Sequence, residues 1–367
     1  MVEKYRLYGA PLSYYSGKAR AYLRYKGIDF EEVLTTPEVY KSVVVGRTGV
    51  AMIPVLVSPD DIAVQDTSEI IDFLEERFPE PPVYPAGPRQ GLAARLLELY
   101  GDEWLVIPAM HYRWAYNFDF VIREFGKVRA PDATPEEQSA IGEEASKFFR
   151  GSLPFLGVTE KSAPAIEASY EALLKDLDRH FGVYDFLFGS RPSIGDFGLF
   201  GPLYAHLYRD PWSGDLMKRI APNVARWVER LNDPTPKSGD FLADDEVPET
   251  LDPVFARMFG EQFPVLHKTV AAVSDWIDEH PGEEVPRSVG FLSFGLEDKT
   301  GARVEEQRAI ISFNQWMLQR PLNFYQSLKE DEKAQADKLL KRLGGFDAMQ
   351  LTIRRPVARR DNKLVAA

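Results

Sequence analysis

The sequence contains no cysteine in 367 residues. This absence excludes a disulfide framework, a thiolate zinc site, a cysteine nucleophile and a Cys-x-x-Cys redox pair. The five histidines have no spacing that suggests a metal site, so we expect no metal. Any thiol chemistry must therefore use a thiol that a ligand brings.

Long apolar runs and an excess of positive charge are also missing. No apolar stretch approaches the roughly 20 residues of a membrane-spanning helix, and residues Met1 to Arg6 lack the basic and then apolar profile of a secretion signal. Acidic residues outnumber basic ones by 56 to 44, so the formal net charge of −12 gives little to drive phosphate counterion release. We therefore expect a cytoplasmic protein that binds neither nucleic acid nor membrane.

The length predicts two or three domains, because single cores usually stop growing at about 250 residues. The first domain, residues 1–82, is expected to be α/β, in the order β-α-β-(loop)-β-β-α. Its expected elements span residues 5–8, 14–26, 28–33, 53–57, 62–64 and 67–78. After a proline-rich linker, residues 88–235 read as an all-helical domain, with a capping box at Ser193 to Asp196.

Residues 236–367 read as a C-terminal extension that mixes helices and strands. Helical patterns cover residues 249–277, 304–328 and 330–343, and prolines are expected to break the first two. Residues 289–294 and 349–353 read as strands that pair as an antiparallel ribbon. The basic tail, Arg354 to Lys363, is expected to fold onto an acidic surface of its own chain or of a dimer mate, to form an exposed anion-binding arm, or to lie over the active site and contribute an arginine.

Three pieces of the first domain carry the candidate chemistry. Ser13 and the hydroxyl-rich residues after it stand at the start of a helix, whose N–H groups favour an anion. Pro54, in Met52-Ile53-Pro54-Val55-Leu56, belongs at an edge or start of a strand, because proline cannot donate to a ladder. The polar run Gln65-Asp66-Thr67-Ser68 stands at another helix start.

Together these pieces resemble the cytosolic glutathione transferases. The resemblance reaches roughly residue 235 and implies a thioredoxin-like domain, an all-helical domain, a homodimer and glutathione as co-substrate. Ser13 falls on the catalytic serine of the serine-type classes, and Ile53 with Pro54 falls on the cis-proline segment that binds the cysteinyl backbone. Asp66 and Thr67, with Gln65 before them, fall on the pair that binds the γ-glutamyl end. Lys41 resembles the lysine that binds the glycyl carboxylate, although Arg47 competes for that role.

Each of these residues also has a purely structural interpretation. Ser13 is either a thiolate donor or only a helix N-cap, and Ser16, Tyr15 and Tyr8 are the alternative hydroxyl donors. Tyr14-Tyr15 also departs from the Pro-Phe of the family. His111 and Trp114, like Tyr8 and Tyr15, are candidates for a substrate pocket or else core residues.

The resemblance implies an enzyme whose bound glutathione thiolate attacks an electrophilic apolar substrate, by conjugation, ether or halide displacement or a related reaction. Serine would then be a hydrogen-bond donor and not a nucleophile. The alternative is a non-catalytic glutathione- or ligand-binding protein on the same fold, because a fold does not decide a function. A tail that plugs the glutathione site would favour that alternative.

Overall fold

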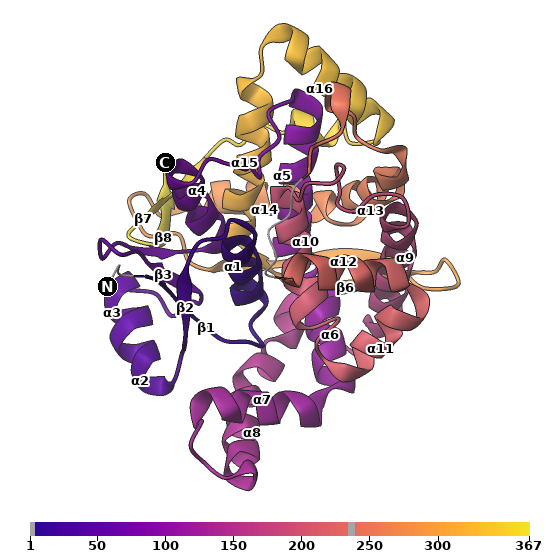
Figure 1. Cartoon of the computed structure of the whole chain (residues 1–367). Helices are drawn as coiled ribbons and strands as arrows, with labels where there is room; N and C mark the ends of the chain where they lie inside the picture. Colours follow the sequence, from indigo (N-terminus) through magenta and orange to yellow (C-terminus); the bar gives the residue numbers. More distant parts are fainter. Residues whose placement is uncertain (1–3, 234–238) are drawn as a thin grey trace.

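A four-stranded sheet organises the first part of the chain, in the strand order β2-β1-β3-β4 (Figure 1). The computed structural model describes residues 4–233 and 239–367, so the expected boundary at 235/236 lies outside them. β1 pairs with β2 in parallel and with β3 antiparallel, and β3 pairs antiparallel with β4. The strands are β1 Tyr5–Gly9, β2 Phe30–Leu34, β3 Val55–Val57 and β4 Ala63–Gln65.

Two helices with side-chain N-caps pack on this sheet. Helix α1, Tyr14–Tyr25, begins after Ser13, and α4, Thr67–Arg77, begins after Asp66; each cap accepts hydrogen bonds from backbone N–H groups of the first turn. Between β2 and β3 the chain forms three short turns, α2 Pro37–Val39, η1 Tyr40–Val45 and α3 Gly46–Thr48. The predicted β-α-β-(loop)-β-β-α order is confirmed.

The middle of the chain is helical, as predicted. Helices α5 and α10 cross closely at two glycines, because a Cβ on Gly101 would lie 2.4 Å from the backbone of Gly198. The predicted capping box is present at the start of α10, where Ser193 and Asp196 cap each other's backbone. The helices are α5 Pro88–Glu103, α6 Val106–Tyr116, α7 Phe118–Arg129, α8 Pro135–Gly151, α9 Ala163–Phe181, α10 Ile194–Ala205, α11 Pro211–Ile220 and α12 Pro222–Asn232, with the 3-10 turn η2 Leu153–Leu156.

The C-terminal extension contains helices and two separate β-hairpins. Helices α13 and α14 are separated at Gln262, and Pro264 stands in the first turn of α14, as the sequence predicts. The bounds are η3 Ala243–Asp245, η4 Glu249–Leu251, α13 Asp252–Glu261, α14 Phe263–Glu279, β5 Ser288–Glu297, β6 Arg303–Ile311, α15 Phe313–Ser327, α16 Glu330–Arg342, η5 Ala348–Gln350, β7 Val357–Arg360 and β8 Lys363–Ala366.

Two predictions for the extension are wrong. The strand at residues 289–294 pairs with β6 and not with residues 349–353, which form a 3-10 turn followed by irregular chain. The first third of the predicted helix 304–328 is therefore strand, and the remaining helix, α15, continues through Pro321. The turn Asp298-Lys299-Thr300-Gly301 explains the difference: the Asp298 carboxylate accepts hydrogen bonds from the N–H groups of Thr300 and Ala302, and Gly301 takes a φ of +82°.

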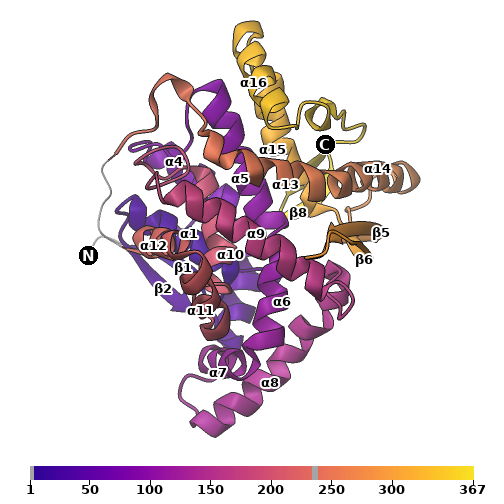
Figure 2. The same cartoon turned by 90° about the vertical axis from the view of Figure 1, so that its right-hand side faces the viewer.

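The extension shares its core with the rest of the chain. One continuous cluster of buried side chains includes Leu7 of the sheet, Tyr100 of the helical part and Leu318 and Leu322 of α15. Figures 1 and 2 show α15 beside α5, and α16 also contacts α5. Arg320 of α15 also forms an ion pair with Asp72 of α4 at 2.7 Å. The extension is therefore a structural part of the domain on which it packs.

Removing the extension should prevent stable folding. A chain ending at residue 235 would expose the face of α5 that α15 covers and would lose Leu318, Leu322 and Tyr325, each at most 3% exposed. Each such side chain stabilises a protein by about 1.5–3 kcal/mol when buried, against a total stability of about 5–15 kcal/mol. We expect the shortened chain to be insoluble or to unfold without a cooperative transition in circular dichroism. A soluble, cooperatively folding product would show that the extension is dispensable.

No helix in the described part of the chain is long and apolar enough to cross a membrane.

Candidate functional site

The three predicted pieces meet at one edge of the sheet. The register places Tyr8 of β1 opposite Val55 of β3, and Val55 opposite Gln65 of β4, so these residues form one row across three strands. The loop to Ser13, the Ile53–Pro54 bond and the Asp66 cap follow directly at that edge. Neighbouring strands lie about 4.8 Å apart, so the row spans about 10 Å. An extended peptide of three residues has about the same length.

Ser13 is the N-cap of α1, and its hydroxyl also remains free to donate. The oxygen accepts a hydrogen bond from the N–H of Ser16 at 3.2 Å. A serine hydroxyl has one donor hydrogen in addition to its acceptor lone pairs. The donor hydrogen of Ser13 has no acceptor in the described chain. The structural and functional interpretations of Ser13 are therefore compatible, since one group can serve both.

Ile53 and Pro54 stand between the two helix starts. Their peptide bond is cis, as the resemblance implies. Ile53 packs with Leu12 against Phe125 and Val128 of α7, so this part of the site has an apolar flank. Arg113 of α6 secures the same flank, because its buried guanidinium donates to the carbonyl oxygen of Leu12 at 2.9 Å while it pairs with Asp210.

The start of α4 presents polar groups that the chain leaves unused. Asp66 has a φ of +80°, and only its Oδ1 is occupied, by the N–H groups of Ser68 and Glu69. Among described atoms, Asp66 Oδ2 and the Thr67 hydroxyl have no hydrogen-bond partner, and neither has Nε2 of Gln65. A carboxylate oxygen beside free donors suits a ligand that carries both an ammonium and a carboxylate group.

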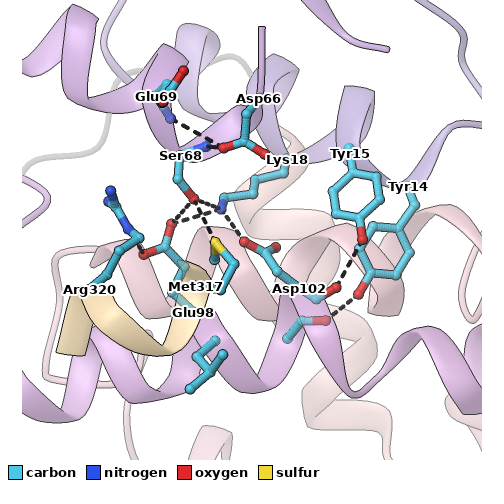
Figure 3. A network of polar contacts seen from close by, with 12 residues as sticks. Tyr14, Tyr15, Lys18, Asp66, Ser68, Glu69, Glu98, Asp102, Met317 and Arg320 are labelled. Atoms are coloured by element: carbon cyan, nitrogen blue, oxygen red, sulfur yellow. Dashed lines mark hydrogen bonds and ion pairs between the residues drawn. The ribbon is translucent and has the colours of Figure 1, made fainter. Parts of the chain in front are cut away.

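The alternative hydroxyl donors have structural roles. Ser16 is fully buried, and its oxygen accepts from the N–H of Ala10 at 3.3 Å. Tyr8 packs among Val44, Val55 and Val57. Tyr15 donates to the carbonyl oxygen of Asp102 at 2.9 Å (Figure 3).

The departure Tyr14-Tyr15 thus has a physical reason. Tyr14 donates to the carbonyl oxygen of Gly101, next to the Asp102 oxygen that accepts from Tyr15. These carbonyls belong to the last turn of α5, where backbone oxygens lack helical partners. The two tyrosines therefore connect the start of α1 to the end of α5.

Lys41 and Arg47 lie in the loop between β2 and β3. Lys41 is exposed in the η1 turn, and its side-chain ammonium has no hydrogen bond to the described chain. Arg47 is bound to Asp61, with 2.7 Å between Nη1 and Oδ1. Of the two cations predicted for a glycyl carboxylate, Lys41 is the one that is available.

The predicted pocket residues of the helical domain are buried. The Nε2 atom of His111 lies 2.9 Å from a carboxylate oxygen of Glu167. Trp114 stacks on Phe125, which in turn packs with Leu12 and Ile53 in the apolar flank of the site. A surface hollow of about 350 Å³ lies at the start of α7 and is lined by Tyr116, Phe118, Phe120, Arg123 and Trp212, among others. His111 and Trp114 as substrate contacts stay a prediction.

Beneath the site lies a buried charged cluster that the sequence did not predict. The ammonium of Lys18, fully buried, contacts Glu98 at 2.8 Å and Asp102 at 2.5 Å (Figure 3). Ser68 donates to Glu98 at 2.7 Å, and Arg320 of the extension approaches the other oxygen of Glu98. Burial opposes ionisation of Glu98, yet Lys18 and Arg320 outweigh it and lower its pKa. Burial also raises the pKa of Asp102, against the attraction of Lys18.

Glu103 is a second buried carboxyl near the site. Burial, reinforced by the neighbouring charges of Asp102 and Asp66, raises the pKa of Glu103 to about 8, and Arg287 and Arg308 oppose this shift only in part. Carboxyls with such perturbed pKa values gather at functional sites. A sequence pattern gives little sign of this, because Glu103 reads as an ordinary charge at a helix end.

The basic tail contacts its own chain at two places. Arg354 pairs with Asp275 and Asp278 of α14, and Arg355 pairs with Asp278, so the start of the tail lies on an acidic surface of its own chain. Farther along, Arg359 donates to both oxygens of Gln65, at the candidate site. The tail therefore flanks the α4 end of the site.

Among the described residues no group of three His, Asp or Glu side chains is placed to hold a metal ion. The unused groups at the sheet edge are hydroxyl, amide and single carboxylate groups, which suit an organic ligand better than a cation.

Comparison with known proteins finds two family models that match parts of the chain. Residues 7–82 match the family model described as glutathione S-transferase, N-terminal domain, and residues 158–230 match the corresponding C-terminal domain. No curated protein sequence matches the chain.

Similar solved structures include three with these descriptions. The beta-etherase LigF from Sphingobium sp. strain SYK-6 is 21% identical, with 63% of this chain and 95% of that chain covered and a TM-score of 0.46. A glutathione S-transferase from Rhodospirillum rubrum F11 is 18% identical, with 67% and 96% covered and a TM-score of 0.40. The rice transferase OsGSTU1, in complex with glutathione, is 20% identical, with 63% and 88% covered and a TM-score of 0.38.

Proposed function

Because this chain contains the N-terminal and C-terminal domains of the glutathione S-transferase family, we propose that it binds glutathione and directs its thiolate at an electrophilic, apolar second substrate. One observation carries the proposal. Ser13, Ile53–Pro54 and Asp66–Thr67 follow one row of the sheet, about 10 Å across, with unused polar groups at both ends.

The proposed binding mode assigns each part of the tripeptide to one segment. The γ-glutamyl ammonium pairs with Oδ2 of Asp66, and the γ-glutamyl carboxylate accepts from Gln65 and Thr67 at the start of α4. The cysteinyl backbone pairs with Ile53, and Lys41 binds the glycyl carboxylate. The thiol then lies at the start of α1, beside Ser13.

The proposed activation of the thiol is consistent in size with what Ser13 and α1 can supply. A free thiol of pKa near 8.5 is only about 3% thiolate at pH 7. Lowering that pKa by about two units requires about 2.7 kcal/mol. A hydrogen bond from Ser13 to the thiolate contributes roughly 1.5–3 kcal/mol, and the helix N-terminus about 0.3–1 kcal/mol. The two contributions together are sufficient.

In the proposed reaction the thiolate sulfur donates its electron pair to an electrophilic carbon. In a substitution the new C–S bond replaces a bond to an ether oxygen or a halide, which leaves with its electron pair. Addition to an activated double bond, isomerisation and glutathione-dependent reduction stay open as variants. The apolar flank of Leu12, Ile53, Phe125 and Val128 supports an apolar second substrate.

Replacing Ser13 with alanine should return the pKa of the bound thiol to roughly 8–9. The variant keeps the site but loses the single donor beside the sulfur. The measurement is the thiolate absorbance of bound glutathione as a function of pH, for the wild type and for Ser13→Ala. In the wild type we expect a thiol pKa near or below about 7.

Tyr15→Phe is the matched control, because the Tyr15 hydroxyl already donates to Asp102. It should leave the thiol pKa unchanged. An equal shift in both variants would assign the effect to altered packing and count against Ser13 as the donor.

The alternative function is a glutathione- or ligand-binding protein without catalysis. The tail supports this alternative, because Arg359 of the β7–β8 hairpin binds Gln65 on the α4 side of the site. Saturable glutathione binding with an unshifted thiol pKa in the same titration would support this alternative. A homodimer, a cytoplasmic location and the domain boundaries rest on the family resemblance and on the sequence, and they stay predictions.

A further inference from the structure

The β7–β8 hairpin at the C-terminal end of the chain is held in place at both ends. Its two-residue turn, Asp361-Asn362, has φ values of +50° and +63°, as a tight hairpin requires. At the turn, the amide of Asn362 donates to the carbonyl oxygen of Thr48 at 2.9 Å. At the other end, Val357 exchanges two hydrogen bonds of 2.9 and 2.8 Å with the side chain of Gln319. The hairpin is thus docked on the first domain and on α15.

From this hairpin Arg359 reaches the candidate site. Its side chain is only 5% exposed and lies over the rings of Phe313 and Trp316. The guanidinium donates to the backbone oxygen of Gln65 at 3.1 Å and to the Gln65 side-chain oxygen Oε1 at 2.5 Å. It also pairs with a carboxylate oxygen of Glu69 at 2.6 Å.

The chemistry of these groups decides how the Gln65 amide is oriented. An arginine side chain has only donors, so the amide must turn its oxygen toward Arg359 and its NH₂ group away. Gln65 is 8% exposed, and its Nε2 bonds to no atom of the described chain. The amide therefore presents an unused donor at the start of α4, beside the free oxygen of Asp66.

We propose that Arg359 is a positioning residue of the glutathione site: by binding Oε1 of Gln65, it holds Nε2 as a donor for the γ-glutamyl carboxylate. This inference rests on the proposed function. Arg359 itself does not contact the ligand, because its guanidinium is occupied by Gln65, Glu69 and Asn362. The C-terminal extension thereby determines recognition of the carboxylate at a site formed by the first domain.

The decisive variant is Gln65→Glu. A glutamate at this position still accepts both hydrogen bonds from Arg359, so the hairpin stays docked, but it offers the ligand an acceptor instead of a donor. Glutathione affinity should fall by roughly tenfold or more, the usual value of a hydrogen bond to a charged group. The analogue that lacks the γ-glutamyl carboxylate is 4-aminobutanoyl-cysteinylglycine. Its affinity for Gln65→Glu should be at least as high as its affinity for the wild type.

Arg359→Lys tests the positioning role directly. Lysine keeps the charge near Glu69 but cannot hold two oxygen atoms with a planar fork. We expect weaker binding of glutathione, by about three- to tenfold for part of one hydrogen bond, and little change for the analogue. Arg360→Ala is the matched control, because Arg360 is exposed on the same strand, and it should bind both ligands normally. Thermal unfolding checks that all three variants remain folded.

The outcomes separate this inference from the proposed function. If the wild-type protein binds neither tripeptide in calorimetry, the proposed function fails and the inference falls with it. If the wild type binds glutathione but Gln65→Glu and Arg359→Lys weaken both tripeptides equally, or neither, only the role of Arg359 is wrong. Selective loss of glutathione binding in both variants supports it.

Discussion

Replacing Lys18 with methionine should lower the free energy of unfolding by about 3–5 kcal/mol, the usual cost of removing one partner from a buried ion pair. Lys18 is 0% exposed and binds two carboxylates, Glu98 and Asp102, that are also buried. Methionine has a similar length but no charge, so both carboxylates would lose their nearest cation while staying buried. Urea unfolding followed by tryptophan fluorescence measures the change.

The control is a second lysine of the same type at the surface. Lys147 lies 2.5 Å from Glu144, as close as Lys18 lies to Asp102, but its side chain is 61% exposed. Lys147→Met should change the stability by less than about 0.5 kcal/mol, because surface pairs contribute little. If the two variants lost similar stability, the buried cluster would not have the structural role assigned to it.

Lys18→Met should also weaken glutathione binding. Ser68 follows Thr67 in the first turn of α4, and its hydroxyl joins the cluster through Glu98 and Lys18. Disturbing the cluster therefore displaces the helix start that carries Asp66.

Replacing Glu103 with glutamine should stabilise the protein progressively as the pH rises. In the folded protein the pKa of Glu103 is raised from an ordinary 4.5 to about 8. The folded state therefore holds a proton that the unfolded state has lost between these two values. The stability that Glu103 contributes is complete below pH 4.5 and declines as the pH rises toward 8, by up to about 1.4 kcal/mol per pH unit.

Glutamine cannot ionise and lacks this decline. Relative to the wild type, Glu103→Gln should gain little near pH 5 and about 3–5 kcal/mol near pH 8. The measurement is the unfolding free energy in urea at pH 5, 6, 7 and 8. Asp102, whose pKa burial also raises, contributes a decline of the same sign, so the variant's curve should become less steep without becoming flat. Parallel curves for the two proteins would show that Glu103 is ionised in the folded state at all these pH values.

The sequence predicted the elements whose signals lie within a few residues. The helix starts at Ser13, Asp66 and Ser193 and the two strands on either side of residues 58–61 are all present, because a cap or a turn uses partners at most four residues away. The strand predicted from the alternation at residues 349–353 is absent, because a strand depends on a partner that is distant in the sequence. A strand needs a partner with free backbone groups, and the neighbouring hairpin supplies β6 to β5 instead.

The candidate site also combines features that local sequence predicts with features that distant contacts decide. The residue types at Ser13, Ile53–Pro54 and Asp66–Thr67 predict where a peptide-like thiol could bind, and the fold brings these residues to one edge. Whether a hydroxyl near the site is free depends on distant partners. The hydroxyl of Tyr15 is occupied by an oxygen 87 residues later in the chain, which no local pattern predicts.

The sequence by itself determined the resemblance to a family, the order of local elements in the first domain and the exclusion of any thiol of the protein's own. Only the tertiary structure decided the state of the charges: that Lys18 is buried between two carboxylates, that Glu103 holds its proton to about pH 8, and that Arg359 reaches Gln65 across 294 residues. The physical reason is that local hydrogen bonds depend on neighbours in sequence. Desolvation and ion pairing depend on which distant segments exclude water, and that is a property of the packed molecule alone.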